Sequence, residues 1–217
     1  IPMRYAQIRK LDISNGENIG VALFVQGCHF HCPNCFNPET WDFNSGKEWT
    51  EEVKNKFMEL VDRPYIKRVS LLGGESLAEE NLDDVLDLVT EINKRYNTTQ
   101  DTVYVKDKNN NILTRLDHER RISRPQKTIW LYTGYNIYFT DYCNKKILSV
   151  KTDDYTLDAA IPTALREKIV EKCDIIVDGR YIDSQRDITL PYRGSKNQRL
   201  IDVKQSIQNE EIILWNS

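Results

Sequence analysis

Short apolar runs alternate with segments of helical periodicity along most of the chain. Residues 21–26 form an apolar run, which predicts a strand buried on both faces. Further strands are predicted at residues 66–72, 128–133 and 174–177. The predicted helices cover residues 50–62, with Thr50 as the N-cap, residues 78–96 and residues 162–172. The chain is therefore expected to alternate strand and helix.

This alternation favours a parallel sheet with helical crossovers, in which ligands bind beyond the carboxyl ends of the strands. Each predicted strand is followed by a distinctive cluster of residues. The four clusters are Cys28, Cys32 and Cys35; Gly73-Gly74-Glu75; Thr133-Gly134-Tyr135; and Asp178-Gly179-Arg180. Because all four follow strand ends, we expect them to converge on one rim of the sheet.

Two polar segments fit the alternation less well. Residues 97–127 contain two β-like runs, 103–106 and 112–115, around a turn-rich segment, and they predict a hairpin insertion. Residues 140–160 contain one further predicted strand at 146–150. We expect a single domain over residues 1–217 that carries these two insertions, because 217 residues is an ordinary length for one domain.

Composition excludes several classes of protein. The chain has 30 Lys and Arg against 33 Asp and Glu, and its net charge of −3 argues against a nucleic-acid or membrane-surface binder. A membrane-spanning helix needs roughly 20 consecutive apolar residues, and no run approaches that length. The opening IPMRYAQIRK is mixed and charged, so no signal peptide is expected, and Met3 is the expected natural start. Five cysteines, an odd number, fit a disulfide framework poorly, so we expect a reducing cytoplasm.

Three of the cysteines, Cys28, Cys32 and Cys35, have the spacing C-x3-C-x2-C. Three thiols can hold an iron–sulfur cluster and leave one iron open to another ligand. A structural zinc ion needs a fourth ligand, which His29 or His31 would supply only with strain in so tight a loop. Three unrelated buried thiols are the remaining alternative.

Five segments resemble, in this order, the radical S-adenosylmethionine enzymes that activate anaerobic ribonucleoside-triphosphate reductases. They are VALFVQGCHFHCPNCFNPETWDFNSGKEWT, SLLGGESL, IWLYTGY, CDIIVDGRY and RGSKNQRL. Five ordered matches across most of the chain are far more specific than the cysteine spacing alone. The resemblance implies an α/β fold, a partial open (β/α) barrel of the radical S-adenosylmethionine type, with the hairpin as an addition.

The resemblance also implies an activity. In that family three cysteines bind a [4Fe-4S] cluster, and S-adenosylmethionine chelates the fourth iron through its amine and carboxylate. One electron from the reduced cluster cleaves the sulfonium C–S bond. The resulting 5′-deoxyadenosyl radical removes a hydrogen atom from a backbone glycine of the reductase. The chain is thus expected to be a cytoplasmic oxidoreductase of the glycyl-radical activase class, similar to the activase of formate C-acetyltransferase.

Individual residues receive expected roles from the same resemblance. Cys28, Cys32 and Cys35 would ligate the cluster, and no side chain is expected to be catalytic beyond cluster and cofactor. Glu75 would accept hydrogen bonds from the methionyl ammonium, and Arg180 would pair with the methionyl carboxylate. The expected cofactor-binding residues are Gly73, Gly74, Glu75, Thr133, Gly134, Asp178, Arg180 and Arg199. Taken singly, each is also consistent with a plain turn or a surface charge.

Three further expectations concern neighbours of this site. Ser76 stands where the family usually has proline, and it can cap the helix that follows. Residues 192–199 carry three cations and two amides, and they are expected to contact the cofactor or to dock the reductase. Cys143 and Cys173 stand apart and are expected to be structural.

The implied partners are the glycine-bearing C-terminal region of the reductase and a one-electron donor such as flavodoxin. No nucleic acid and no membrane is expected. Two alternatives stay open: a radical S-adenosylmethionine enzyme with another peptide or nucleoside substrate, and a zinc-stabilised binding module without catalysis. Iron and sulfide analysis separates the zinc module from both radical enzymes.

Overall fold

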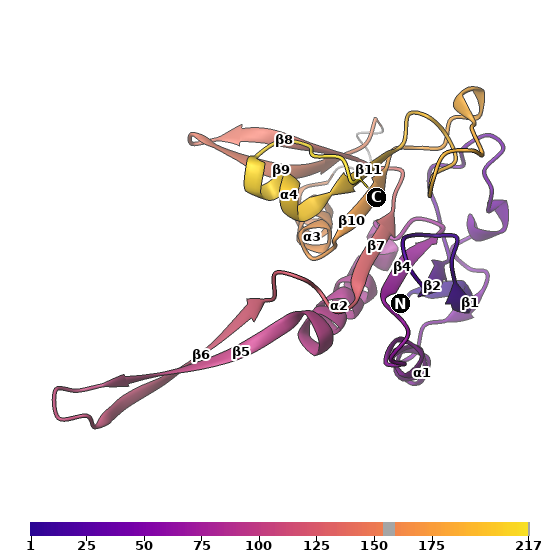
Figure 1. Cartoon of the computed structure of the whole chain (residues 1–217). Coiled ribbons are helices and arrows are strands. Elements are labelled where there is room, and N and C mark those ends of the chain that lie inside the picture. Colours follow the sequence, from indigo (N-terminus) through magenta and orange to yellow (C-terminus); the bar gives the residue numbers. More distant parts are fainter. Residues whose placement is uncertain (154–158, 217) are drawn as a thin grey trace.

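The main body of the protein is a seven-stranded sheet with the strand order β11-β10-β7-β4-β2-β1-β3 (Figure 1). The computed structural model describes residues 1–153 and 159–216. The strands of this sheet are β1 (Arg4–Asp12), β2 (Gly20–Val25), β3 (Lys47–Glu48), β4 (Arg68–Gly73), β7 (Thr128–Tyr132), β10 (Ile175–Asp178) and β11 (Arg199–Asp202). Within the described residues the edge strands β3 and β11 do not pair with each other, so the sheet is open.

The four predicted strands form the parallel centre of the sheet. β2 pairs with β4, β4 with β7 and β7 with β10, all in parallel, which confirms the predicted arrangement. The strands at the edges are antiparallel and are not predicted by the sequence pattern: β1 pairs with β2, and β11 pairs with β10. β1 is mostly exposed or half-buried, so it lacks the apolar run that identifies a central strand.

Both faces of the central strands are buried. One face packs against α1 (Glu51–Val61), α2 (Leu82–Ile92) and α3 (Ala160–Glu171) in the main hydrophobic core. Alternate residues of the same strands, among them Phe24, Leu72 and Trp130, point to the opposite face and form smaller clusters there. No helix among the described residues has the length and apolar character needed to cross a membrane.

The helix beginnings confirm one predicted cap and correct another. The Thr50 hydroxyl accepts a hydrogen bond from the Val53 amide at 3.2 Å, so Thr50 caps α1 as predicted. The predicted helix over residues 78–96 consists of a 3-10 turn (Glu79–Asn81), α2 and a π turn (Asn93–Asn97). Ser76 does not cap it: its buried Oγ has no hydrogen-bond partner among the described residues. The helical turn starts three residues beyond Ser76, too far for the hydroxyl to reach its free amides.

Two hairpins extend the fold beyond the sheet. β5 (Thr98–Lys106) and β6 (Ile112–Arg121) form a long ribbon that projects from the body (Figure 1). The predicted hairpin is therefore confirmed, although its strands are longer than the β-like runs. β8 (Asn136–Tyr142) and β9 (Lys145–Lys151) form a second hairpin that includes the predicted strand at 146–150. Residues 154–158 of the second predicted insertion lie outside the described residues, and α4 (Val203–Asn209) follows β11.

A buried ion pair holds the loop between β1 and β2 against the sheet. The Arg68 side chain is fully buried, and its guanidinium lies 2.9 Å from the carboxylate of the equally buried Asp12. Arg68 also donates to the backbone carbonyls of Asp12, Glu17 and Asn18 at 2.8, 3.1 and 3.2 Å. A single side chain at the start of β4 thus fixes the course of this loop.

Replacing Arg68 with alanine is expected to lower the free energy of unfolding by about 3–5 kcal/mol, because Asp12 would stay buried without its partner. The matched control is Lys56→Ala, which removes an exposed ion pair with Glu52 and should leave stability nearly unchanged. Urea unfolding of both variants checks this, and equal losses would contradict the assignment.

Candidate functional site

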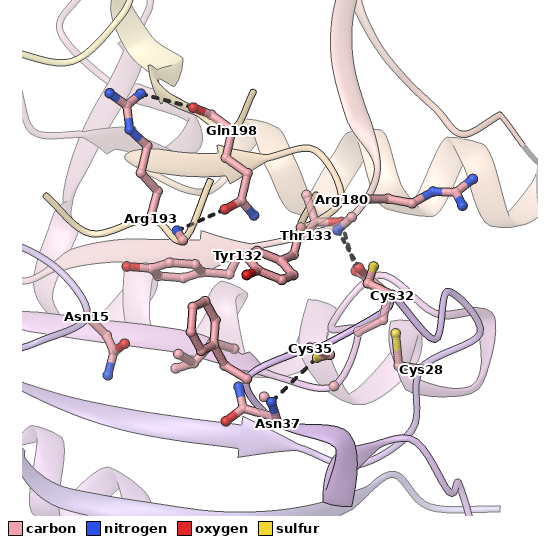
Figure 2. A pocket seen from close by; sticks show the side chains of 18 of the residues that line it. Asn15, Cys28, Cys32, Cys35, Asn37, Tyr132, Thr133, Arg180, Arg193 and Gln198 are labelled. Atoms are coloured by element: carbon pink, nitrogen blue, oxygen red, sulfur yellow. Dashed lines mark hydrogen bonds between the residues drawn. The ribbon is translucent and has the colours of Figure 1, made fainter. Parts of the chain in front are cut away.

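The predicted rim clusters line one cavity of about 460 Å³ (Figure 2). Its lining includes the predicted site residues Cys28, Cys32, Cys35, Gly73, Gly74, Glu75, Thr133, Gly134 and Arg180. The predicted convergence of the clusters on one rim is therefore confirmed. Asp178 and Arg199, also predicted to bind cofactor, are not among the residues that line the cavity.

The cysteine loop is closed at its base by backbone hydrogen bonds. The Gly27 and Cys28 amides donate to the Thr40 and Trp41 carbonyls at 2.7 and 3.1 Å. Inside the loop, the Asn37 amide lies 3.4 Å from Cys35 Sγ. The loop leaves β2 after Val25 and returns at Thr40 and Trp41, and all three half-buried thiols line the cavity.

Both histidines of this loop face away from the thiols. His29 Nε2 lies 2.9 Å from Glu80 Oε1, at the start of the helical turn before α2. The His31 ring stacks on Trp41, with ring centroids 4.5 Å apart. Neither histidine lines the cavity. Through these contacts with Glu80 and Trp41, the two histidines stabilise the loop from outside the cavity.

Burial is the largest cause of the pKa shifts of Cys28 and Cys32. It raises the pKa of Cys28 to about 12, with a further contribution from the nearby Glu75 carboxylate. It also raises the pKa of Cys32, where Cys35 adds to the shift and Arg180 opposes it. Because a buried thiolate is costly, these side chains become thiolates only beside a cation. Among the described residues, no three His, Cys, Asp or Glu side chains surround one point as the ligands of a single metal ion do.

Glu75 joins the carboxyl ends of β4 and β7. Its side chain is buried, and Oε1 accepts a hydrogen bond from the Gly134 amide at 2.7 Å. Oε2 accepts from the Leu77 amide at 2.9 Å and from the Thr133 hydroxyl at 2.8 Å. Burial raises the pKa of Glu75, and these donors oppose the shift. A carboxylate offers about four acceptor sites, so three donors leave room for one more.

Two glycines let this rim approach the cysteine loop. Gly73 has a φ of +102°, which side chains rarely adopt. A Cβ on Gly74 would come within 2.5 Å of the Gly27 carbonyl oxygen. The Glu75 amide donates to that same carbonyl at 2.7 Å. Larger residues here would push the cysteine loop away from the end of β4.

Arg180 lines the cavity but extends away from the cysteines (Figure 2). Its guanidinium carbon lies 4.9 Å from the centre of the Phe30 ring, and its Nη2 lies 4.0 Å from the Asp153 carboxylate. The charge is thus held at the edge of the site.

Asp178 and Arg199 pair with each other behind the rim. Arg199 donates to the buried Asp178 carboxylate at 3.1 and 2.6 Å, and the Ile137 amide donates to it at 3.0 Å. This pair joins β10, β11 and β8, and it fixes the point where Gly179 and Arg180 leave the sheet.

The segment over residues 192–199 folds into a loop fastened to Gly179 and Arg180. Gln198 Oε1 accepts from the Gly194 amide at 2.9 Å, and Gln198 Nε2 donates to the Gly179 carbonyl at 3.0 Å. Asn197 donates to the Arg180 carbonyl at 2.7 Å. Four residues of this loop, Tyr192, Arg193, Gly194 and Gln198, line the cavity.

The cavity also extends well beyond the rim, along the face of the sheet opposite the helices. Phe24, Leu72, Tyr132, Arg9 and Asn15 also line it, with Asn15 at the end far from the cysteines (Figure 2). Figure 2 shows Tyr132 between Asn15 and the cysteines. The sequence pattern does not predict this part of the cavity, because β1 has no apolar run. Tyr132, which directly precedes Thr133, is the residue whose position could have revealed it.

The sequence matches the family described as a 4Fe-4S single cluster domain over residues 14–112 and 101–201. The two matched segments meet within the β5–β6 ribbon. Over 198 residues the chain is 31% identical to the anaerobic ribonucleoside-triphosphate reductase-activating protein of Salmonella typhimurium, covering 90% of this chain and 96% of that protein. The protein of the same name from Escherichia coli K12 is 30% identical over the same shares. That of Enterobacteria phage T4 is 27% identical, covering 91% of this chain and 93% of the phage protein.

An α/β sheet with three thiols at its carboxyl rim and a match to a single-cluster family defines an iron–sulfur protein. Its relatives narrow that class further. The chain belongs to the family of anaerobic ribonucleoside-triphosphate reductase-activating proteins.

Replacing Thr133 with valine should lower the free energy of unfolding by about 1–3 kcal/mol, because the buried Glu75 carboxylate loses a hydrogen-bond donor. Thr128→Val is the control on the same strand, since its hydroxyl makes only a long 3.4 Å contact with the Lys67 carbonyl. Chemical denaturation compares the two. The coupling of the strand ends through Glu75 is wrong if both variants unfold alike.

Proposed function

We propose that this chain activates an anaerobic ribonucleoside-triphosphate reductase by generating a glycyl radical on it. The observation that carries the proposal is the convergence of three thiols and the Glu75 rim on one cavity, in a chain of the activating-protein family. The open sheet with a parallel centre supports the finer fold class, a partial (β/α) barrel of the radical S-adenosylmethionine type. The enzyme class that we propose is a radical S-adenosylmethionine oxidoreductase.

The donor set suits a [4Fe-4S] cluster. The thiolates of such a cluster bind separate irons, so the sulfurs of Cys28, Cys32 and Cys35 need only line a shared cavity. Burial disfavours the charged form of Cys28 and Cys32, and bound iron supplies the cation that their thiolates require. Three protein ligands leave the fourth iron for S-adenosylmethionine.

When bound, the reduced cluster supplies the electron that cleaves the C–S bond of S-adenosylmethionine, giving methionine and the radical that removes the glycine hydrogen. Glu75 holds the rim through three hydrogen bonds and keeps one acceptor site, which suits the methionyl ammonium. Gly73, Gly74, Thr133 and Gly134 form the rest of the proposed binding edge.

Arg180 is the proposed partner of the methionyl carboxylate, because this residue lines the cavity and its positive charge opposes the rise in the pKa of Cys32. Asp178 and Arg199 contribute by fixing the backbone on which Arg180 sits. Beyond the rim, Phe24, Leu72 and Tyr132 give the cavity an apolar floor that limits the entry of water.

We propose the glycine-bearing C-terminal region of the reductase as the substrate. A one-electron donor such as flavodoxin is the proposed source of the electron. Cytoplasmic location belongs to the same proposal, since free thiols persist in that compartment.

Replacing Cys28, Cys32 or Cys35 with alanine should remove most of the iron and sulfide and abolish the glycyl radical. Cys143→Ala is the matched control, because Cys143 is exposed and lies outside the cavity. The measurement is metal analysis after anaerobic reconstitution, followed by electron paramagnetic resonance with reductant, S-adenosylmethionine and reductase. Stoichiometric zinc without sulfide would contradict the proposal. A full cluster that forms no glycyl radical on a competent reductase would also contradict it.

A further inference from the structure

The β5–β6 ribbon leaves apolar side chains and strand edges uncovered. Its sheet has two strands, so each strand keeps an unpaired outer edge among the described residues. Ile112 and Leu113, near the tip, are 60% and 65% exposed. Isolated two-stranded ribbons are marginal in water, and a free apolar edge invites another strand.

Around its middle, residues 102–105 and 114–117, the ribbon has an apolar and a polar face; towards the root, the apolar face gives way to Asp101, His118 and Arg120. In its register Val103 faces Leu116, and both side chains lie on the apolar face. Tyr104 faces Arg115 and Thr102 faces Asp117 on the other face. The Asp117 carboxylate accepts hydrogen bonds from Thr102 at 2.8 Å and from Arg115 at 2.9 Å. Any strand added to this ribbon must match both faces.

The charges of β6 are complementary to a second, antiparallel β6. With a two-fold axis at Leu116, Leu116 faces its own copy on the apolar face. On the polar face, Arg115 of each copy then faces Asp117 of the other. The next position outward adds no repulsion, because His118 faces Thr114. Beyond Thr114 the β6 strand is irregular, since Lys106 pairs with Ile112 and Leu113 is skipped.

We propose that a second copy of this chain pairs with β6 along its free edge in this register, giving a four-stranded sheet with an apolar row of Val103 and Leu116 side chains across its centre. Other registers of the same pairing bring less favourable charges together. Moving the axis by one residue sets Arg115 or Asp117 against its own copy, and like charges directly opposite are destabilising. Moving it to His118 sets Asp117 against Glu119, and moving it to Thr114 loses both ion pairs.

β5 does not offer an equivalent edge. Its charged side chains are Asp101 and Lys106, and they lie on opposite faces of the ribbon. An antiparallel pairing that brought them together would set the apolar face of one copy against the polar face of the other. The free edge of β6 is therefore the self-complementary edge.

Charge reversal tests the register directly. Arg115→Asp and Asp117→Arg each convert both cross-strand ion pairs into like-charge pairs. Each should raise the dimer dissociation constant by about tenfold or more. An equimolar mixture of the two single variants should restore dimers, because the two acidic side chains of one variant then face the two basic side chains of the other. Within each variant chain the two charges stay alike, so only pairing between copies explains such a rescue.

Sedimentation velocity over a concentration series measures the effect on the whole chain, purified without oxygen. Lys106→Glu, an equal charge reversal on β5, is the control and should leave the dissociation constant unchanged. Circular dichroism checks that every variant folds. A monomeric parent chain, single variants that stay dimeric, or a mixture without rescue would each overturn the proposal. So would variants that keep the oligomeric state but lose reductase binding, since the ribbon would then serve the reductase.

Discussion

The buried carboxylate of Glu75 is the constraint on which the rim of the site depends. Burying a carboxylate is costly unless donors satisfy it, and here the donors come from the ends of two strands. The Glu75 amide also bonds to Gly27, at the root of the cysteine loop. Moving any of these segments would leave the charge unsatisfied. The rim and the loop are thus held together by the protein's own bonds, which is the preorganisation that a positioning site needs.

The two faces of the sheet have different roles: one forms the core and the other borders the cavity. Helices cover one face and complete the core. The other face is bounded by the loop that Arg68 fixes and by the loop that Gln198 fastens to Gly179, and the cavity lies between them. Each of these loops is held by one buried or half-buried side chain that bonds to backbone carbonyls or amides. The cavity keeps its shape through these few attachments.

The sequence predicts the part of the molecule whose residues are buried on both faces. The central strands and the capped helix α1 follow from apolar runs and from Thr50, and the convergence at the rim follows from parallel pairing. The sequence pattern does not predict β1 and β11, because an antiparallel edge strand is held by its neighbour's backbone and needs no apolar run. The far end of the cavity is missed for the same reason. Asp178 and Arg199 are of residue types found in binding sites, but in the structure they bond to each other, a contact that the sequence does not reveal.

The root of the ribbon explains how an insertion can coexist with the site. The chain enters β5 after α2 and returns to the amino end of β7, and the Ile122 amide donates to the Asn97 carbonyl at 2.8 Å there. Arg121 pairs with Asp174, at the amino end of β10, at 2.7 Å. The cysteines follow the carboxyl end of β2, at the opposite end of the sheet. A contact made along β6 therefore leaves the rim uncovered, so pairing between copies and access of a large substrate to the cavity do not compete for the same surface.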